Sequence, residues 1–288
     1  MRNISLENIT DAVQASFKDA ADPRQREVIM SLVSHLHAFA REVHLTNDEW
    51  NAGIDFLWRA GKISDERRNE FILTSDVLGL SSLVDILNGS PAGTESSVLG
   101  PFYVADAPLL PVGASIVGDN GGERVLLRGR VSDLAGRPVA GALLDFWQTD
   151  ADGIYSQMAP AKPPFNLRCR MHSDADGCYA LVTVKPRFYS VPYDGPVGDL
   201  LRAGGRHAWR PSHFHALVTA PGYRRLVTEI FADDDPYIDG DAVFGVRRSL
   251  VAHFARRDDA RAAAPVVIEA PYFEVNFDFR LDPADART

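Results

Sequence analysis

The spacing of apolar residues changes near residue 90, and this change constrains the fold more than any other feature of the sequence. Between residues 28 and 43, apolar side chains recur at intervals of four and three, as on one face of an amphipathic helix. These residues are Val28, Leu32, Leu36, Phe39 and Val43. Near the C-terminus, apolar and polar residues instead alternate strictly over 273–279, which is typical of a half-buried antiparallel strand. We therefore expect an α+β protein whose helices precede its strands.

Short polar side chains mark the predicted helix starts. Asp22 stands before a proline, so a favourable N-cap is followed by the residue preferred at the first helical position. Thr46 and Glu49 have the spacing of a capping box. Ser64 is the predicted N-cap of a further helix that continues to the Gly- and Pro-containing segment 88–93, where the helical pattern ends.

This segment separates two predicted domains. We predict a helical domain over residues 1–95 and a second domain, rich in strands, over residues 96–288. Short apolar runs at 124–131 and 142–148, bounded by turn sequences, predict strands. Many short strands separated by Gly, Pro and Asp turns favour a mainly antiparallel β-sandwich or a barrel.

Composition excludes several classes of protein. The formal net charge is -9, whereas a general nucleic-acid binder needs a basic surface. The chain has only 2 cysteines, Cys169 and Cys178, too few for a disulfide-stapled scaffold or a cysteine-based zinc module. No apolar run approaches the ~18 to 20 residues of a membrane span, and the first residues lack a signal-peptide core. We expect a cytoplasmic protein.

The sharpest local motif is the His-x-His pair in the sequence Arg-Pro-Ser-His-Phe-His at 210–215. Residues two apart on a strand point to the same face, so His213 and His215 can both reach one metal ion. Two solvent-facing strand histidines explain the motif about equally well. A third ligand from a carboxylate would have to come from Glu229, fourteen residues further on, as in a cupin-like His/His/Glu site for iron(II).

Tyrosine is the other candidate ligand. Tyr155 and Tyr189 lie in irregular segments beside predicted strands, where functional side chains concentrate. A phenolate is a hard, anionic donor that favours a trivalent ion. The residues alone do not select these two from the 8 tyrosines of the chain, since a packed aromatic ring explains each of them as well.

Several motifs in a fixed order resemble the intradiol ring-cleavage dioxygenases, and within them the hydroxyquinol 1,2-dioxygenases. The motifs occupy residues 22–24, 70–79, 100–102, 144–155, 189–198, 207–215 and 241–250. The resemblance covers nearly the whole chain. It implies a helical N-terminal region followed by a β-sandwich core, a homodimer formed through the N-terminal helices, and a phospholipid bound at the dimer interface.

The resemblance also implies one iron(III) per subunit, held by Tyr155, Tyr189, His213 and His215. Tyr189 is then the axial ligand that leaves the metal and acts as a base toward the substrate, and His213 lies opposite it. Arg210 matches the arginine that the family places beside the substrate. The implied reaction inserts both atoms of O2 and cleaves a catechol between its two hydroxylated carbons. Catechols give a muconate, and hydroxyquinol (benzene-1,2,4-triol) gives maleylacetate.

Substrate contacts are also carried over from the resemblance. The positions that line the substrate ring in the family match Leu73, Asp76, Val98, Leu99, Gly100, Pro101 and Phe102. The opposite wall matches Ala242 and Val243, with Arg210 and Glu229 completing the predicted contacts. Asp76 is either an acceptor for the third hydroxyl of hydroxyquinol or a helix-surface aspartate. Glu229 stands where relatives commonly have glutamine or histidine.

Two other functions remain open at this point. One is a cupin-like iron(II) dioxygenase that uses His213, His215 and Glu229. The other is a non-catalytic β-sandwich binding module with a helical dimerisation arm. The first is distinguished by the effect of a Glu229 substitution on metal binding, and the second by the metal content of the purified protein.

Overall fold

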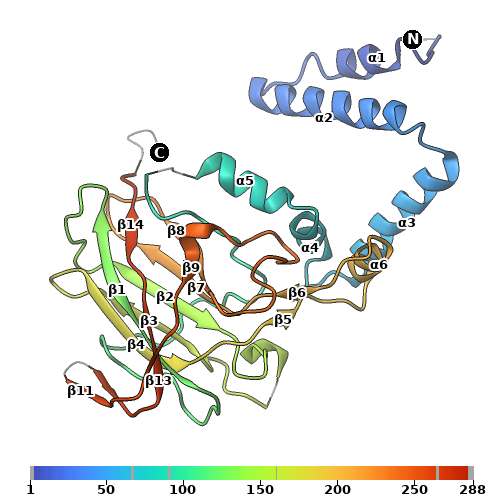
Figure 1. Ribbon diagram of the computed structural model, residues 1–288. Helices are drawn as coiled ribbons and strands as arrows, with labels where there is room; N and C mark the ends of the chain where they lie inside the picture. Colours follow the sequence, from blue (N-terminus) through green and yellow to red (C-terminus); the bar gives the residue numbers. More distant parts are fainter. Residues whose placement is uncertain (1–2, 66–67, 90–91, 160, 264–265, 285–288) are drawn as a thin grey trace. The chain divides into compact units, whose positions relative to one another are not determined.

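The computed structural model describes residues 3–65, 68–89, 92–159, 161–263 and 266–284. The chain forms two compact units, Met1–Arg59 and Ala60–Thr288 (Figure 1). The boundary between the units lies inside helix α3 (Asn47–Ile63). The domain boundary predicted between residues 95 and 96 divides the chain at a different place and stays a prediction. No helix among the described residues is long and apolar enough to cross a bilayer.

In the first unit, helices α1 (Ile9–Ser16) and α2 (Pro23–Glu42) pack against each other. Both caps predicted here are confirmed. Asp22 accepts hydrogen bonds from two backbone N–H groups in the first turn of α2. Thr46 and Glu49 exchange hydrogen bonds between side chain and backbone at the start of α3. The sequence therefore specified these helix starts locally.

The apolar stripe between residues 28 and 43 lies on α2 and is exposed. Its five side chains are 49–56% exposed, and no residue of α2 is buried. Polar contacts hold the other side of the helix, where Gln14 donates to the hydroxyl of Ser34 and Thr10 pairs with His37. The first unit thus presents an apolar face that its own helices do not cover.

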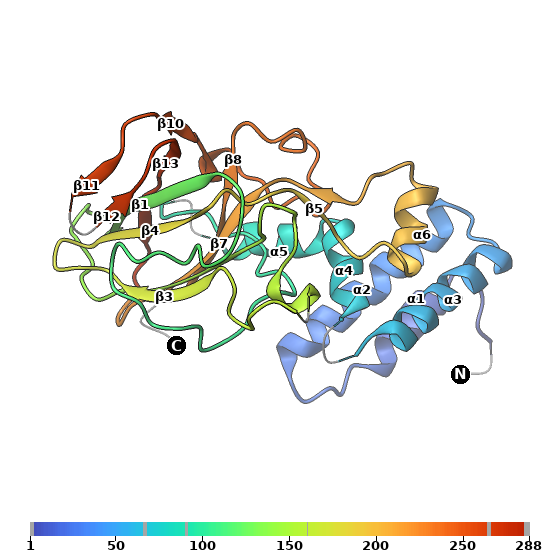
Figure 2. The same cartoon turned by 90° about the horizontal axis from the view of Figure 1, so that it is seen from below.

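The described part of the second unit contains three helices of eight or nine residues. They are α4 (Glu70–Val77), α5 (Leu80–Asn88) and α6 (Pro196–Ala203). They gather at the end of the unit where the short strands β5 (Tyr189–Ser190) and β6 (Trp209–Arg210) pair (Figures 1 and 2). These helices and strands therefore surround one end of the β-structure.

The prediction of one helix starting at Ser64 is wrong in two respects. Asn69, not Ser64, caps α4, because α3 continues to Ile63 and the Ser64 hydroxyl donates back to the carbonyl of Ala60. Gly79 then separates α4 from α5, since its φ of 74° is left-handed and ends the first helix. Apolar spacing alone did not reveal this break.

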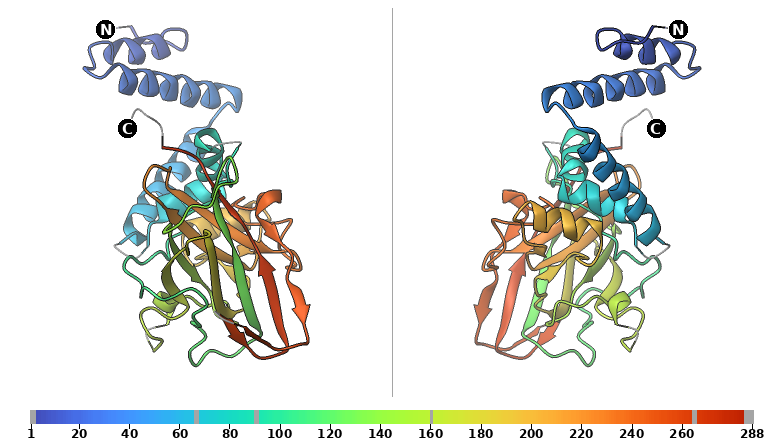
Figure 3. Two further views of the ribbon diagram at one scale, coloured as in Figure 1. Left: turned by 90° about the vertical axis from the view of Figure 1, so that its left-hand side faces the viewer. Right: turned by 90° about the vertical axis from the view of Figure 1, so that its right-hand side faces the viewer.

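The strands of the second unit form two main layers (Figure 3). One sheet has the order β10-β13-β1-β14, with β4 also pairing with β1, and the other has the order β3-β2-β7-β8-β9. The first sheet contains β1 (Arg124–Asp133), β4 (Cys178–Val184), β10 (Ala255–Arg257), β13 (Tyr272–Asn276) and β14 (Phe279–Leu281). The second contains β2 (Leu143–Gln148), β3 (Arg168–His172), β7 (His213–Thr219), β8 (Leu226–Ala232) and β9 (Val251–Ala252). The remaining elements are β11 (Arg261–Ala263), β12 (Val266–Ile268) and the 3-10 turns η1 (Ser156–Met158) and η2 (Arg248–Leu250).

Most of the pairings are antiparallel. The exceptions among the described strands are β1 with β13, β1 with β14, and β8 with β9. Apolar side chains from both sheets meet in one buried core, including Leu127 of β1, Phe146 of β2 and Phe214 of β7. The predicted mainly antiparallel β-sandwich is confirmed.

Strand β7 divides its side chains between two environments. Phe214 belongs to the core between the sheets. His213 and His215 alternate with it and therefore lie on the opposite face of the sheet. Trp147 of β2 and Glu229 of β8 are paired in register with His215 and share that outer face. Polar and aromatic residues thus gather on the face that points away from the core.

We expect Gly129→Ala to destabilise the second unit by about 3 kcal/mol, as overpacking does. Gly129 lies in β1, where an added Cβ would be 1.7 Å from the carbonyl oxygen of Phe277, a backbone atom that cannot rotate away. Gly121→Ala is the matched control, since nothing lies within 4 Å of its Cβ position. Urea denaturation followed by circular dichroism measures both changes. Equal unfolding free energies for the two variants would contradict this packing argument.

Candidate metal centre

The two histidines of β7 bring their ring nitrogens together. The Nε2 atoms of His213 and His215 lie 3.1 Å apart. Nδ1 of His213 donates to the carbonyl oxygen of Pro211 at 2.6 Å, so its Nε2 carries a lone pair. Both side chains are buried, and burial lowers the pKa of each imidazole. A neutral imidazole with a free nitrogen is the form that binds a transition metal.

Tyr155 reaches the same point from the turn that follows β2. Its hydroxyl oxygen lies 3.1 Å from Nε2 of His215 and 3.4 Å from Nε2 of His213. Burial, followed by the charge of Tyr189, raises the pKa of the Tyr155 phenol well above its usual value. The phenol therefore ionises only when a strong positive charge is next to it.

Tyr189 is the fourth member of the group and comes from β5. Its ring centroid lies 5.3 Å from that of Tyr155 and 5.8 Å from that of His213. In the β5–β6 pair, Tyr189 stands opposite Arg210. Burial raises the pKa of the Tyr189 phenol, and the guanidinium of Arg210 acts in the opposite direction. Arg210 thus acts on Tyr189 through a hydrogen bond as well as through its charge, whereas it acts on Tyr155 through its charge alone.

Two glycines let the backbone come close to these side chains. Gly153 has a φ of +80°, and a Cβ there would lie 2.7 Å from the carbonyl oxygen of Phe188, next to Tyr189. Gly100 has a φ of +69°, and its Cβ position is 3.4 Å from Cε1 of His215. Both positions favour glycine because of their backbone conformation and because of the space available.

The donor atoms fit a metal ion. The two Nε2 atoms and the Tyr155 hydroxyl oxygen form a buried cluster in which each atom is 3.1–3.4 Å from the others. A cation at this point would use the lone pairs that face one another. Two phenolates and two neutral imidazoles form a hard, doubly anionic set suited to a trivalent transition metal. The structure thus brings together all four residues predicted as ligands.

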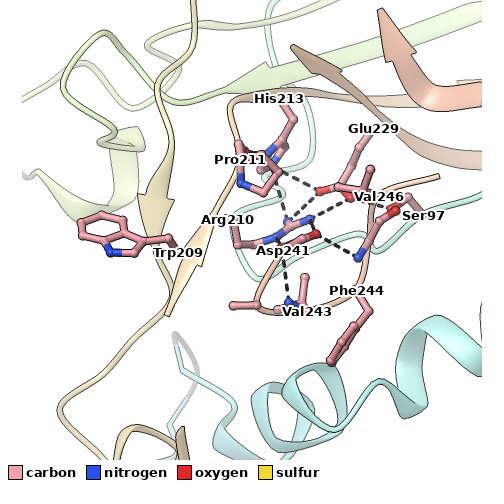
Figure 4. Close-up of polar contacts among 12 residues, drawn as sticks. Ser97, Trp209, Arg210, Pro211, His213, Glu229, Asp241, Val243, Phe244 and Val246 are labelled. Atoms are coloured by element: carbon pink, nitrogen blue, oxygen red, sulfur yellow. Dashed lines mark hydrogen bonds and ion pairs between the residues drawn. The ribbon is translucent and has the colours of Figure 1, made fainter. Parts of the chain in front are cut away.

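The guanidinium of Arg210 is buried between two carboxylates (Figure 4). Its NH1 and NH2 groups donate to the two oxygens of Glu229 at 2.7 and 3.0 Å. Its Nε and NH2 groups donate to the two oxygens of Asp241 at 3.1 Å each. Burial alone would raise the pKa of Glu229, but Arg210, His213 and Ser97 together hold that pKa below its usual value. Two negative charges and one positive charge leave this cluster with a formal charge of -1.

Glu229 offers an alternative ligand set. Its Oε1 atom lies 3.3 Å from Nε2 of His213 and 3.5 Å from Nδ1 of His215, so the three side chains are close enough to bind one ion. Both carboxylate oxygens already accept hydrogen bonds, however. Oε1 accepts from Arg210 and Oε2 from Arg210 and from the hydroxyl of Ser97 at 2.5 Å. These bonds favour Glu229 as a neighbour of the site over Glu229 as a ligand.

Asp241 and Ser97 were not among the residues predicted from the sequence. Asp241 also accepts backbone N–H bonds from Val243 and Gly245, which fixes the loop that follows it. Ser97 additionally donates to the carbonyl of Gly245. Asp241 does begin the motif at 241–250, but nothing in the sequence indicates that it pairs with Arg210, since that contact depends on tertiary structure.

A cavity of about 590 Å³ lies next to the candidate ligands. Seven predicted substrate contacts line it, namely Leu73, Asp76, Val98, Leu99, Gly100, Pro101 and Phe102. Phe102 connects the cavity to the metal centre, because its ring stacks on Tyr155 with centroids 4.4 Å apart. Ser81, Val84 and Asp85 of α5 also line the cavity, and the sequence did not single them out.

The other predicted substrate contacts lie outside this lining. Arg210 and Glu229 are buried in the ion cluster, and Ala242 and Val243 are buried in the loop that follows Asp241. Their contact with a substrate stays a prediction.

Comparisons with known proteins agree with this geometry. The family model described as Dioxygenase matches residues 98–283, and the model described as Catechol dioxygenase N terminus matches residues 22–94. The chain belongs to the intradiol ring-cleavage dioxygenases. The predicted family and enzyme class are therefore confirmed.

Individual relatives of this intradiol dioxygenase align over almost its full length. A hydroxyquinol 1,2-dioxygenase of Rhizobium sp. is 47% identical over 96% of this chain and 95% of the relative. A 6-chlorohydroxyquinol 1,2-dioxygenase of Cupriavidus pinatubonensis is 44% identical over 98% and 99%. The crystal structure of hydroxyquinol 1,2-dioxygenase from Pseudomonas putida DLL-E4 has a TM-score of 0.91 at 44% identity, covering 97% of this chain and 99% of that chain. Intradiol dioxygenases use non-haem iron, which is consistent with the donor set described above.

A buried carboxylate beside the centre gives a pH-dependent prediction. Asp145 lies on β2, two residues before Trp147, whose ring stacks on His215. It accepts a hydrogen bond from the Tyr103 hydroxyl at 3.2 Å, and its other oxygen has no partner among the described residues. Burial raises its pKa to about 6. The folded state therefore favours the protonated form, and stability from this group is lost as the pH rises through about 6.

We expect Asp145→Asn to stabilise the protein more at pH 8 than at pH 4. The gain in the free energy of unfolding should be larger by about 2 kcal/mol at pH 8. The amide keeps the acceptor for Tyr103 and removes the cost of ionising a buried carboxyl group. Urea denaturation of both proteins at the two pH values measures the difference. An effect of the same size at pH 4 and pH 8 would show that burial does not raise the pKa of this carboxyl group.

Proposed function

We propose that this intradiol dioxygenase binds one iron(III) per subunit through Tyr155, Tyr189, His213 and His215. It cleaves hydroxyquinol, or a related catechol, between its adjacent hydroxylated carbons with O2. The observation that carries the proposal is the buried cluster of the Tyr155 oxygen and the two histidine Nε2 atoms within 3.1–3.4 Å. The names of the relatives, which include hydroxyquinol 1,2-dioxygenases, support the substrate class. When bound, iron(III) supplies the positive charge that stabilises a doubly deprotonated diol and makes its ring reactive toward O2.

Tyr189 is suited to receive a proton from the substrate. It lies beside the guanidinium of Arg210, which stabilises the phenolate form, while burial stabilises the phenol. A phenol under these opposing influences can hold or release a proton at its hydroxyl oxygen. Arg210 itself cannot move, since Glu229 and Asp241 fix four of its N–H groups. Arg210 therefore acts as a fixed charge beside Tyr189.

The walls of the cavity suit an aromatic ring. Phe102, Pro101 and Leu73 supply apolar walls next to the ligands. Asp76 is 7% exposed and lines the same cavity. Its carboxylate is hydrogen-bonded by Ser81, and its remaining lone pairs can accept a hydrogen bond from the third hydroxyl of hydroxyquinol, which plain catechol lacks. This arrangement favours the triol.

We expect Tyr189→Phe to retain iron but to lower kcat by at least about 100-fold, which is a typical loss when an acid–base group is removed. The intense visible absorption of a tyrosinate–iron(III) protein should change in Tyr189→Phe and in Tyr155→Phe. Tyr223→Phe is the control, since Tyr223 packs against the main core away from the candidate ligands. Iron analysis, visible spectra and O2 uptake are measured together. A colourless protein that is fully loaded with iron would refute the tyrosinate ligands.

Glu229→Gln separates the two ligand sets. Glutamine keeps the shape of the side chain but removes the anionic ligand, so a His/His/Glu site should lose its metal. The tyrosinate set predicts that iron content and the tyrosinate absorption persist. Iron analysis of the purified variant decides, and loss of the metal would favour the iron(II) alternative.

We also propose that the chain forms a homodimer through its N-terminal helices. The support is the exposed stripe on α2, whose five apolar side chains have no cover in the first unit. An uncovered apolar face of this kind favours association. The bound phospholipid stays a prediction, which extraction of the native protein and mass spectrometry would test.

Sedimentation velocity should give a dimer, and Leu36→Glu should shift it toward the monomer because it places a charge in the middle of the stripe. Ala38→Glu is the matched control, since Ala38 is also exposed on α2 but lies outside the stripe. Wild-type protein that sediments as a monomer at micromolar concentration would contradict the homodimer.

A further inference from the structure

The substrate cavity is larger than a triol requires. Its volume of about 590 Å³ falls within the range of about 300–1,000 Å³ that accommodates drug-sized ligands. Gly100 and Phe102 form the wall next to the metal centre, whereas Ser81, Val84 and Asp85 line it from the side of α5. A single ring at the metal centre therefore leaves room toward α5 for a substituent on that ring.

Three carboxyl groups line the cavity: Asp65 accepts a hydrogen bond from the backbone N–H of Arg68, and the other two, Asp76 and Asp85, lie on helices. Asp76 lies on α4 and Asp85 on α5, and both line the cavity. Burial raises the pKa of each of these two carboxyl groups, and the charge of Asp76 adds to the effect on Asp85. Asp76 and Asp85 are thus like charges on the wall of one partly desolvated cavity.

Neither carboxylate forms an ion pair among the residues that the structure describes, although Ser81 hydrogen-bonds to Asp76. The cation that acts on Asp76, Arg210, is bound by Glu229 and Asp241. The cation that acts on Asp85 is Arg247, whose guanidinium donates to Ser82 and to backbone carbonyls.

Arg68 at the edge of the cavity is also paired with carboxylates, although its NH2 group has no hydrogen-bond partner among the described residues. It pairs with Glu70 at 2.8 Å and with Asp194 at 2.7 Å. The interior of the cavity is therefore apolar near the ligands and negatively charged near α5. A negative charge that is partly removed from water is costly until a cation or a hydrogen-bond donor meets it.

We propose that the cavity also admits catechols whose ring carries a short side chain ending in an ammonium group, which Asp85 and Asp76 accept, and that it rejects catechols with a carboxylate at that place. The inference rests on the proposed function and names a further substrate class for the same site. The reaction is unchanged, since one ring C–C bond breaks, both atoms of O2 enter the product and the amine takes no part. The ammonium replaces repulsion between two carboxylates with attraction, and a carboxylate would add a third negative charge.

Three catechols that differ only in the end of the side chain test this inference with the iron-loaded enzyme. They are 4-(2-aminoethyl)catechol, 4-ethylcatechol and 3-(3,4-dihydroxyphenyl)propanoate, with hydroxyquinol as the reference. We expect kcat/KM for the amine to exceed that for the carboxylate by at least about tenfold, chiefly through KM. Asp85→Asn should lower the ratio of amine to ethylcatechol and raise the ratio of carboxylate to ethylcatechol. Asp119→Asn is the matched control, because it removes the same charge from an exposed residue outside the cavity lining.

Equal kcat/KM for the amine and the carboxylate, or unchanged ratios in Asp85→Asn, would overturn the inference. The proposed function would still stand if the same enzyme turned over hydroxyquinol. A binding experiment covers the case in which no substrate is turned over. Calorimetry with tyramine, 4-ethylphenol and 3-(4-hydroxyphenyl)propanoate needs no reaction, since these monophenols lack the second hydroxyl. Tighter binding of tyramine that is weakened by Asp85→Asn would support the inference, and equal binding of all three would refute it.

Discussion

The buried pairing of Arg210 with Glu229 and Asp241 is the interaction on which the rest of the site depends. It joins β6, β8 and the loop after Asp241, and through Ser97 it also holds the segment that leads into the cavity wall. Removing one partner of such a buried cluster typically costs about 3–5 kcal/mol, because a charge is left without compensation. The two carboxylates therefore hold the guanidinium at a fixed position beside Tyr189. The two carboxylates outweigh the positive charge of Arg210, so the cluster as a whole is not positive. Arg210 therefore contributes a cationic group at a fixed position.

Alternation along β7 explains why the candidate ligands lie where they do. Phe214 anchors the strand in the core, and the residues on either side of it must then point outward. On the neighbouring strands, Trp147 stacks on His215 with an interplanar angle of 5°. Glu229 places its Oε1 atom within 3.5 Å of a ring nitrogen of each histidine. The sandwich thus fixes the histidines through a rigid central strand. Tyr155 comes from the turn after β2 and Tyr189 from the two-residue strand β5, and Gly153 allows these two segments to approach each other closely.

Local features were predictable from the sequence, whereas features that depend on distant contacts were not. The caps at Asp22 and Thr46 and the common face of His213 and His215 follow from local spacing and are present in the structure. The break at Gly79 was missed because apolar residues continue across it. The choice of Tyr155 and Tyr189 required the family resemblance, since nothing in their neighbouring residues distinguishes them. Partners such as Asp241 for Arg210 and the placement of Asp85 at the cavity arise only from the tertiary fold.

The parallel pairing of β1 with β13 has a consequence for how the protein is made. Arg128 and Asn276 are partners in register and also hydrogen-bond through their side chains, although 148 residues separate them. On the ribosome, β1 emerges long before β13, so it can pair with β4 first but must wait for its parallel neighbour. Such non-local pairing is slow because a long loop must close first. The helices of the first unit face no such delay, and the sandwich that supports the metal centre is completed only when synthesis has passed β14.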